Sequence, residues 1–191
     1  MVSGIVALVL EANPLLSWRD VQGVLISSTI KNHDWDSDWI TNGVGLWVNH
    51  NYGFGLIDAY NSVKNAQNWT NLPEQLKHFV LFNVTETITE IYPLDIEIPI
   101  DVSMIIEHVE IYVNATHQRG GDLFIELISP MGTHSILAEP HQDNSPGFDW
   151  KFGTIRNWGE NSVGIWILRI HDRVKGYHGY TNTVGLNLYG H

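Results

Sequence analysis

The stretch Val109-Glu110-Ile111-Tyr112-Val113 sets apolar side chains at every second position. This period of two is typical of a β-strand with one buried face. Strands of the same kind are expected at residues 79–82, 94–98, 123–128, 164–170 and 184–189. Glycine, proline and Asn/Asp clusters separate them, and no helical pattern intervenes. The second part of the chain is therefore predicted to be an antiparallel sandwich or jelly roll.

Upstream of residue 70 the pattern is helical instead. Residues 1–12 are small and apolar on nearly all sides, which predicts a helix buried inside a domain. Asn13-Pro14 ends it, because proline disfavours the helical conformation in the residue before it. A second helix is expected to begin after Ser17, an N-cap with Asp20 three residues on. We expect the face that it buries to consist of Val21, Val24, Leu25 and Ser28.

A polar loop follows at residues 33–42, and glycines mark a short extended stretch at residues 43–55. A third helix is predicted over residues 56–66, with an apolar stripe of Leu56, Ile57, Tyr60 and Val63. Residues 67–75 read as a linker.

Charge and cysteine content limit the partners and the compartment. Acidic residues outnumber basic ones by 21 to 10, giving a formal net charge of −11. Such a chain repels phosphate backbones, so nucleic acid is not expected as a partner. No run of about 18 apolar residues is present, so no membrane span is expected within residues 1–191. Cysteine is absent, but three glycosylation sequons begin at Asn68, Asn83 and Asn114 and favour the secretory pathway.

Several blocks of the first part resemble one protease family. Met1-Val2-Ser3-Gly4-Ile5-Val6-Ala7-Leu8 is similar to the helix that follows the nucleophile motif of subtilisin-like serine proteases. The run 10–22, which contains Trp18-Arg19-Asp20-Val21-Gln22, resembles the next segment of kexin and the proprotein convertases. Tyr52-Gly53-Phe54-Gly55-Leu56-Ile57-Asp58-Ala59, followed by Asn68-Trp69-Thr70, is similar to the end of their catalytic domain.

The β-rich part resembles the P domain, or Homo B domain, of the same family. The resemblance is carried by residues 106–109, 121–123, 129–133, 147–152, 158–161, 164–166 and 188–190. The run 158–164 and the lack of cysteine are most similar to the fungal kexin branch. Many relatives carry Arg-Gly-Asp before the leucine that matches Leu123. Here Arg119-Gly120-Gly121-Asp122 replaces it, and Gly120-Gly121 is predicted to be a hairpin turn.

The resemblance implies an α/β remnant of a subtilisin-like (peptidase S8) catalytic domain at 1–70. It implies an all-β antiparallel jelly-roll or sandwich P domain at 71–191. The parent would be a calcium-dependent serine endopeptidase that cleaves proproteins after paired basic residues, with the P domain stabilising its catalytic domain. The family's catalytic triad and calcium ligands would lie upstream. No catalytic, substrate-binding or metal-binding residue is therefore expected within this chain, and residues 1–191 alone are expected to be inactive.

The same resemblance places the parent in the secretory pathway. It would lie in the Golgi or trans-Golgi network, anchored to the membrane by a segment outside residues 1–191, or it would be secreted. Its partners would be substrates with basic cleavage sites and the upstream remainder of its own catalytic domain. Two alternatives stay open: a bacterial-type secreted subtilisin-like protease without dibasic specificity, and a non-catalytic P-domain module that binds carbohydrate or protein.

Other residue patterns are interpreted as structural. Ser3 matches a helix-packing position and not the nucleophile. Asp34, Asp36 and Asp38 alternate as calcium ligands do, but the glycine and distal glutamate of an EF-hand loop are missing, so a solvated acidic loop is expected. The ten histidines lack the spacing of a zinc site, and nothing selects a Ser/His/Asp triad among them. Aromatic residues could line a sugar-binding face, but Trp150, Trp158 and Trp166 are expected to fill the core.

Overall fold

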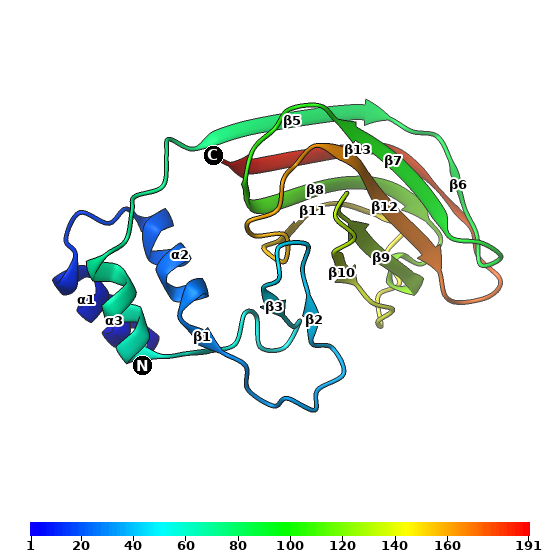
Figure 1. Ribbon diagram of the computed structural model, residues 1–191. Helices are drawn as coiled ribbons and strands as arrows, with labels where there is room; N and C mark the ends of the chain where they lie inside the picture. Colours follow the sequence, from blue (N-terminus) through cyan, green and yellow to red (C-terminus); the bar gives the residue numbers. More distant parts are fainter. The chain divides into compact units, whose positions relative to one another are not determined.

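Alternating apolar side chains build two antiparallel sheets in the second half of the chain (Figure 1). The computed structural model describes all residues, 1–191. The chain divides into two compact units: unit 1 comprises residues 1–41 and 45–74, and unit 2 comprises residues 42–44 and 75–191. Unit 2 contains both large sheets.

One sheet of unit 2 has four strands in the order β10-β9-β12-β7. The other has the order β11-β8-β13-β5, with β6 also pairing with β13. The bounds in the first sheet are β7 Leu94–Ile100, β9 Leu123–Ile128, β10 His134–Ala138 and β12 Gly164–Asp172. In the second they are β5 Leu76–Asn83, β6 Thr87–Ile88, β8 Ile106–His117, β11 Phe148–Thr154 and β13 Gly179–Gly190.

The inward faces of the two sheets form the core of unit 2. On β8 and β13, Val113 pairs with Val184 and Ile111 with Leu186, and all four side chains are fully buried. The other sheet adds buried residues such as Leu168 of β12. The period of two along each strand sends these side chains to one face, so the sequence pattern decides the core. The predicted mostly β, antiparallel architecture is confirmed.

All six predicted strands are present, and the structure adds others. Strands β10 and β11 were not expected, although residues 148–152 alternate apolar and polar side chains as a strand does. Both lie at sheet edges. Gly120-Gly121 is not a hairpin turn: Gly120–Asp122 is a single 3₁₀ turn between β8 and β9. Trp166 is fully buried, as expected of a core residue, whereas Trp150 is 63% exposed. The expectation for Trp150 was wrong because its strand lies at a sheet edge.

Unit 1 contains three helices and two pairs of two-residue strands. The helices are α1 Val2–Ala12, α2 Trp18–Ser27 and α3 Ala59–Gln67. The strand pairs are β1 Thr29–Ile30 with β4 Leu56–Ile57, and β2 Ile40–Thr41 with β3 Trp47–Val48. The N-cap prediction is confirmed, since Ser17 and Asp20 form a capping box at the start of α2.

The third helix begins later than predicted. Leu56 and Ile57 pair with β1, and Asp58 caps the helix with its side chain. Leu56 and Tyr60 are exposed, so the predicted apolar stripe was wrong; the buried residues of α3 are Ser62 and Ala66. The pairing of β4 with β1 overrides the helical pattern at these two positions.

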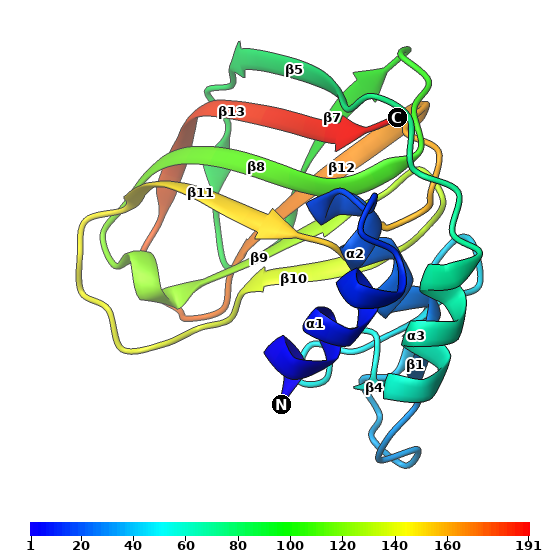
Figure 2. The ribbon, with the colours of Figure 1, turned by 90° about the vertical axis from the view of Figure 1, so that its left-hand side faces the viewer.

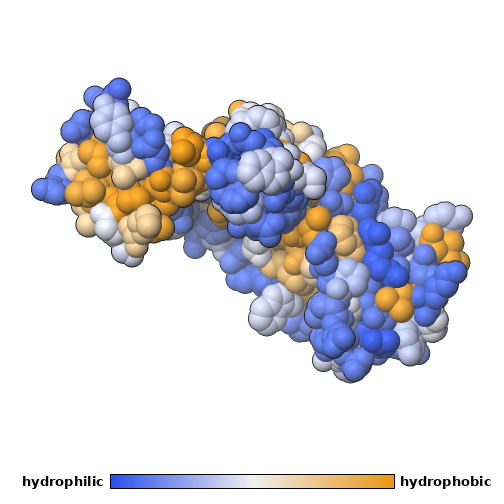
Figure 3. All heavy atoms as spheres, turned by 90° about the horizontal axis from the view of Figure 1, so that it is seen from below, coloured by the Kyte–Doolittle hydropathy of each residue, from blue (hydrophilic) through white to orange (hydrophobic).

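Helix α1 is apolar but mostly exposed. Only Val9 is buried among its residues, although ten of its eleven positions carry no charge. The small core of unit 1 joins Val9 to Leu16, Val21, Val24 and Ala66. Figure 3 shows hydrophobic residues gathered at the helical end of the chain. The expected buried helix is thus formed, but within residues 1–191 it is not covered.

Candidate functional site

Glu160 is a carboxylate enclosed inside unit 2, with none of its surface exposed. Its Oε1 atom accepts a 2.8 Å hydrogen bond from the backbone N–H of Gly43 and a short one from the hydroxyl of Thr133. Its Oε2 atom accepts a 3.2 Å hydrogen bond from Nδ2 of Asn157. A buried carboxylate is tolerated only where donors replace its water. The backbone of Gly43 is one of these donors.

The tripeptide Asn42-Gly43-Val44 and the three side chains of Thr133, Asn157 and Glu160 form what we call the 42–44 anchor. The Nδ2 atom of Asn42 donates 3.0 Å hydrogen bonds to the carbonyl oxygens of Arg156 and Trp158. The Gly43 N–H is also 3.0 Å from the Thr133 hydroxyl. Three residues that are distant in sequence from the sandwich are therefore fixed in it by directed hydrogen bonds.

Sterics select glycine at the centre of the anchor. A Cβ atom at Gly43 would lie 2.4 Å from the Cβ of Met131 and 3.1 Å from the Glu160 carboxylate. Real Cβ contacts are not that short, so any side chain at this position would have to displace the Met131 turn. The dipeptide Asn-Gly is a general turn signal, and nothing else in the sequence marks residues 42–44 as part of the β-rich unit.

Two turns present the acceptors of the anchor, and both contain motifs that carry the family resemblance. In residues 129–133, the Thr133 N–H donates to Oγ of Ser129, and the Ser129 N–H donates to the Thr133 carbonyl. In residues 158–161, Gly159 has φ of +84°, which favours glycine, and its N–H donates to the carbonyl of Ile106. The Ile106 N–H donates in return to the Glu160 carbonyl. These motifs converge in space, which their separation in sequence does not reveal.

A second polar centre ties the end of unit 1 to its second helix. Asp20 accepts a 3.0 Å hydrogen bond from Nε1 of Trp69 and a 2.7 Å bond from the Leu72 N–H. Its neighbour Arg19 donates from Nη1 to the carbonyl of Pro73 at 2.7 Å. The Trp18-Arg19-Asp20 block and the Asn68-Trp69-Thr70 block, which were recognised separately in the sequence, therefore contact each other.

The hydrogen bonds at Asp20 favour its charged form. Burial by itself would raise the pKa of this carboxyl. The bonds from the Ser17 hydroxyl, the Leu72 and Ser17 amides and the Trp69 indole outweigh burial, and the pKa is lowered. At neutral pH, Asp20 is thus an ionised carboxylate that joins α2 to residues 69–72 by hydrogen bonds.

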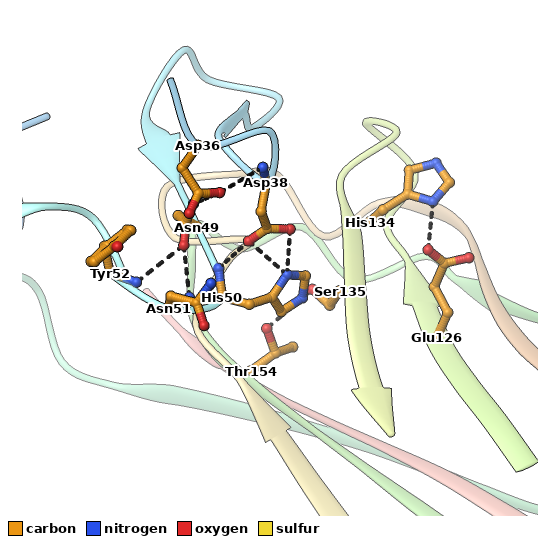
Figure 4. A network of polar contacts seen from close by, with 10 residues as sticks. All are labelled: Asp36, Asp38, Asn49, His50, Asn51, Tyr52, Glu126, His134, Ser135 and Thr154. Atoms are coloured by element: carbon orange, nitrogen blue, oxygen red, sulfur yellow. Dashed lines mark hydrogen bonds and ion pairs between the residues drawn. The ribbon is translucent and has the colours of Figure 1, made fainter. Parts of the chain in front are cut away.

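The acidic loop of unit 1 makes hydrogen bonds that leave little for a cation. Asp36 accepts a 3.1 Å hydrogen bond from Nδ2 of Asn49 and one from the N–H of Asp38 (Figure 4). The Oδ1 atom of Asp38 lies 2.8 Å from Nδ1 of His50. The Oδ2 atom of Asp38 also accepts a hydrogen bond from the backbone N–H of His50. No three His, Cys, Asp or Glu side chains are placed to hold a metal ion. The carboxylates of Asp36 and Asp38 are thus engaged in hydrogen bonds within unit 1.

The structure places the predicted acceptor asparagines on different elements. Asn68, at the C-terminus of α3, and Asn83, at the end of β5, are both exposed. Asn114 lies within β8 and is half-buried; its side chain donates to Asp149 at 3.1 Å and accepts from Asn182 at 2.8 Å. Modification at these positions stays a prediction.

Further single residues can now be placed. Ser3 is exposed on α1. His134 lies 2.9 Å from Glu126 within unit 2 (Figure 4). His117 is fully buried and is 3.2 Å from Asp172. No helix is both long enough and apolar enough to cross a bilayer.

Comparisons with known proteins match the β-rich unit and extend over the chain. Residues 106–188 match the family described as proprotein convertase P-domain. Furin of Mus musculus is 39% identical over 207 residues, which covers 100% of this chain and 25% of furin. Proprotein convertase subtilisin/kexin type 5 of Rattus norvegicus is 41% identical over 186 residues, which covers 90% of this chain and 10% of that protein.

A solved structure shares the architecture of the whole chain. The serine protease of Aeromonas sobria superimposes with a TM-score of 0.91 at 26% identity, over 100% of this chain and 43% of that protein. The chain spans about a quarter or less of the length of the curated relatives named above.

Proposed function

This chain carries a P domain of the kexin/proprotein convertase family, and from that premise we propose that it forms the C-terminal part of a serine endopeptidase. Its relatives are serine proteases of the subtilisin family. On this proposal, unit 1 contributes the last helices of the catalytic domain. The parent enzyme would be calcium-dependent and would cleave proproteins after paired basic residues. The triad and the calcium ligands would lie outside residues 1–191.

The 42–44 anchor is the observation that carries the role proposed for the P domain. The chain leaves unit 1 at Thr41, contributes three residues to unit 2 and returns to unit 1 at Gly45. The buried Glu160 holds the middle residue, Gly43, by its backbone. Folding of unit 2 therefore fixes residues 42–44, which are continuous along the chain with unit 1 at Thr41 and at Gly45. We propose that the P domain stabilises the catalytic domain through these three residues.

The exposure of α1 supports the proposal that unit 1 is part of a larger domain. A helix with a single charged residue that buries only Val9 loses most of the stabilisation expected from its composition, which is about 25 cal/mol for each Å² of apolar surface removed from water. Met1, Val2 and Leu8 are each about half exposed or more. Contiguous exposed apolar surface of this kind marks a packing interface. The partner proposed is the remainder of the catalytic domain.

The reading as a bacterial-type protease has less support. A bacterial-type protease without dibasic specificity shares the fold, but identity to the Aeromonas sobria enzyme is 26%, against 39% to furin. These values favour a convertase. Secretory localisation is proposed on the same relatives, and glycans on Asn68 and Asn83 would agree with it. Expression in a eukaryotic secretory host, followed by mass measurement before and after glycosidase treatment, tests those two positions.

Two measurements test the proposal as a whole. Purified residues 1–191 should not cleave Lys-Arg or Arg-Arg reporter peptides, whereas the complete protein should. In the complete protein, Glu160→Ala should lower the yield of active secreted enzyme several-fold, because a destabilised unit reduces the folded population. Glu97→Ala, at an exposed position on β7, is the matched control. Cleavage by residues 1–191 alone, or equal yields from the two variants, would contradict the proposal.

A further inference from the structure

A groove with a cavity of about 240 Å³ opens in unit 2 between the edges of its two sheets. Its floor is apolar and includes Leu123 and Ile125 of β9. Its wall is the aromatic inward face of β11, formed by Phe148, Trp150 and Phe152. Figure 2 shows β10 and β11, which lie at the ends of the two sheets, joined by a long loop. None of the residues of the 42–44 anchor lines this groove.

The groove exists because the sandwich does not close at this edge. Trp150 pairs with the buried Val113, so its side chain points to the inner face of its sheet, yet it is 63% exposed. Across the groove, the register of β10 shifts between Ile136 and Ala138. This irregularity brings the small Ala138 opposite Ile125, where a larger residue would fill the space. An indole ring therefore stands in a site that its own sheet does not cover.

The rim of the groove is held in place before any ligand arrives. The loop 139–147 lies directly on Gly120 and Gly121: the His141 N–H donates to the Gly121 carbonyl at 2.7 Å, and the Gly120 N–H donates to the Ser145 carbonyl at 2.8 Å. A Cβ atom at Gly121 would lie 2.4 Å from the His141 carbonyl oxygen. This close approach needs glycine, which is the structural reason for the Gly120-Gly121 pair. A preorganised rim lowers the entropic cost of binding.

One edge of β11 has no strand partner along the groove. The strand pairs with β8 on one side only and ends its sheet. At one end of β11, the Thr154 hydroxyl donates a 3.1 Å hydrogen bond to the Ser135 hydroxyl of β10. The residues from Phe148 to Phe152 lie beside the groove, away from this contact between β11 and β10. An open edge presents backbone donors and acceptors that an extended peptide can pair with.

The charge of the lining selects the kind of peptide. The carboxylate of Asp143 lines the groove, and neither lysine nor arginine does. The hydroxyl and amide of Ser145 bind the Asp143 carboxylate and lower its pKa, so it keeps its charge in mildly acidic surroundings. A guanidinium group can stack on an indole face while it pairs with a carboxylate. Aromatic and acidic groups thus meet at one place.

We infer that the groove binds an extended basic peptide segment, which adds a strand to the free edge of β11 and places an arginine side chain between Trp150 and Asp143. The interaction goes beyond the scaffolding role proposed above and does not depend on it. The peptide would be recognised by its backbone and its charge, away from any residue that performs catalysis.

Fluorescence anisotropy with residues 1–191 and a fluorescein-labelled, acetylated (Arg-Val)₃ amide tests the inference. Binding should weaken about tenfold or more in Trp150→Ala, the loss expected when a central aromatic anchor is truncated. Ile165→Ala, at a comparably exposed apolar position on β12, is the matched control and should bind as the parent chain does. The (Glu-Val)₃ peptide should not bind. Backbone amide shifts on titration should centre on residues 148–152.

A second arm needs no protein variant. N-methylation of alternate residues in (Arg-Val)₃ removes the N–H groups that would pair with β11 and should abolish binding. Equal binding of the methylated peptide, of the glutamate peptide, or by Trp150→Ala would overturn the inference, as would the absence of any binding. Pairing of two copies through β11 would overturn it as well, and sedimentation would detect this as a concentration-dependent dimer that Trp150→Ala abolishes.

Discussion

Helix α1 of unit 1 and strand β8 of unit 2 are both rich in apolar residues, but they have opposite fates. Val109, Ile111 and Val113 of β8 are fully buried, because β13 and the facing sheet cover them. On α1 only Val9 is buried. Local pattern forms both elements, while burial requires partners from elsewhere in the chain. Unit 2 contains its own partners, whereas the core around the helices of unit 1 has only five buried apolar residues.

The largest effect is expected from Glu160→Ala in unit 2. The substitution removes the carboxylate that accepts from the Gly43 N–H, the Thr133 hydroxyl and the Asn157 amide, and it opens a cavity. The free energy of unfolding of unit 2 should fall by about 3 kcal/mol, which lowers its Tm by roughly 10 °C. Calorimetry of residues 1–191 measures this. If the change is no larger than for Glu97→Ala, the anchor does not stabilise unit 2.

Glycine substitutions compare the two units directly. Gly43→Ala forces a methyl group against Met131 and should cost unit 2 about 2 kcal/mol. Gly4→Ala lies in α1, where nothing stands within 4 Å of the added carbon. It should stabilise unit 1 by about 0.5 kcal/mol, since alanine favours the helix. Chemical denaturation can be followed by circular dichroism, with the far-ultraviolet helical signal reporting on unit 1 and the near-ultraviolet aromatic signal on unit 2. Equal effects of the two substitutions would show that Gly43 has room for a side chain.

A local effect that depends on pH is expected at Asp20. Its pKa is lowered in the folded state, so its contribution is full above the unfolded pKa of about 4 and is lost as the pH falls through the folded value. Asp20→Asn should reduce the hydrogen-exchange protection of the Leu72 amide about tenfold near pH 6. The difference should shrink at lower pH. The Leu186 amide in β13 serves as the internal control. If the difference in Leu72 protection between the two proteins grows as the pH falls, the ionised Asp20 carboxylate does not stabilise this contact.

The sequence predicted the regular elements better than the irregular ones. The apolar pattern predicted both ends of β9 correctly, and the capping box predicted the start of α2. Leu56 and Ile57 were assigned to a helix because their pattern is compatible with one, but β1 pairs with them. This error arises because a neighbouring segment, and not the local sequence, decides the conformation. Edge strand β11 was not predicted although its residues 148–152 alternate apolar and polar side chains; they were identified only as a family motif.

The candidate site was predictable only in pieces. The motifs at 129–133 and 158–161 were identified as family features, and Gly43 was identified as part of a glycine-marked stretch. No spacing rule joins the three, because residues 43 and 160 are more than a hundred positions apart. The groove was even less accessible, since it depends on a register shift in β10 and on a loop that lies on Gly121.

By itself the sequence determined the strands, the helix starts, the acidic charge and the resemblance to a protease family with a P domain. These follow from side-chain period, capping chemistry and motif identity, which are local properties. Only the tertiary structure decided that residues 42–44 belong to the β-rich unit, that α1 is uncovered, and that Trp150 stands open beside β11. Each of these depends on which distant segments meet, and therefore on packing and on hydrogen bonds between groups that the linear order keeps apart.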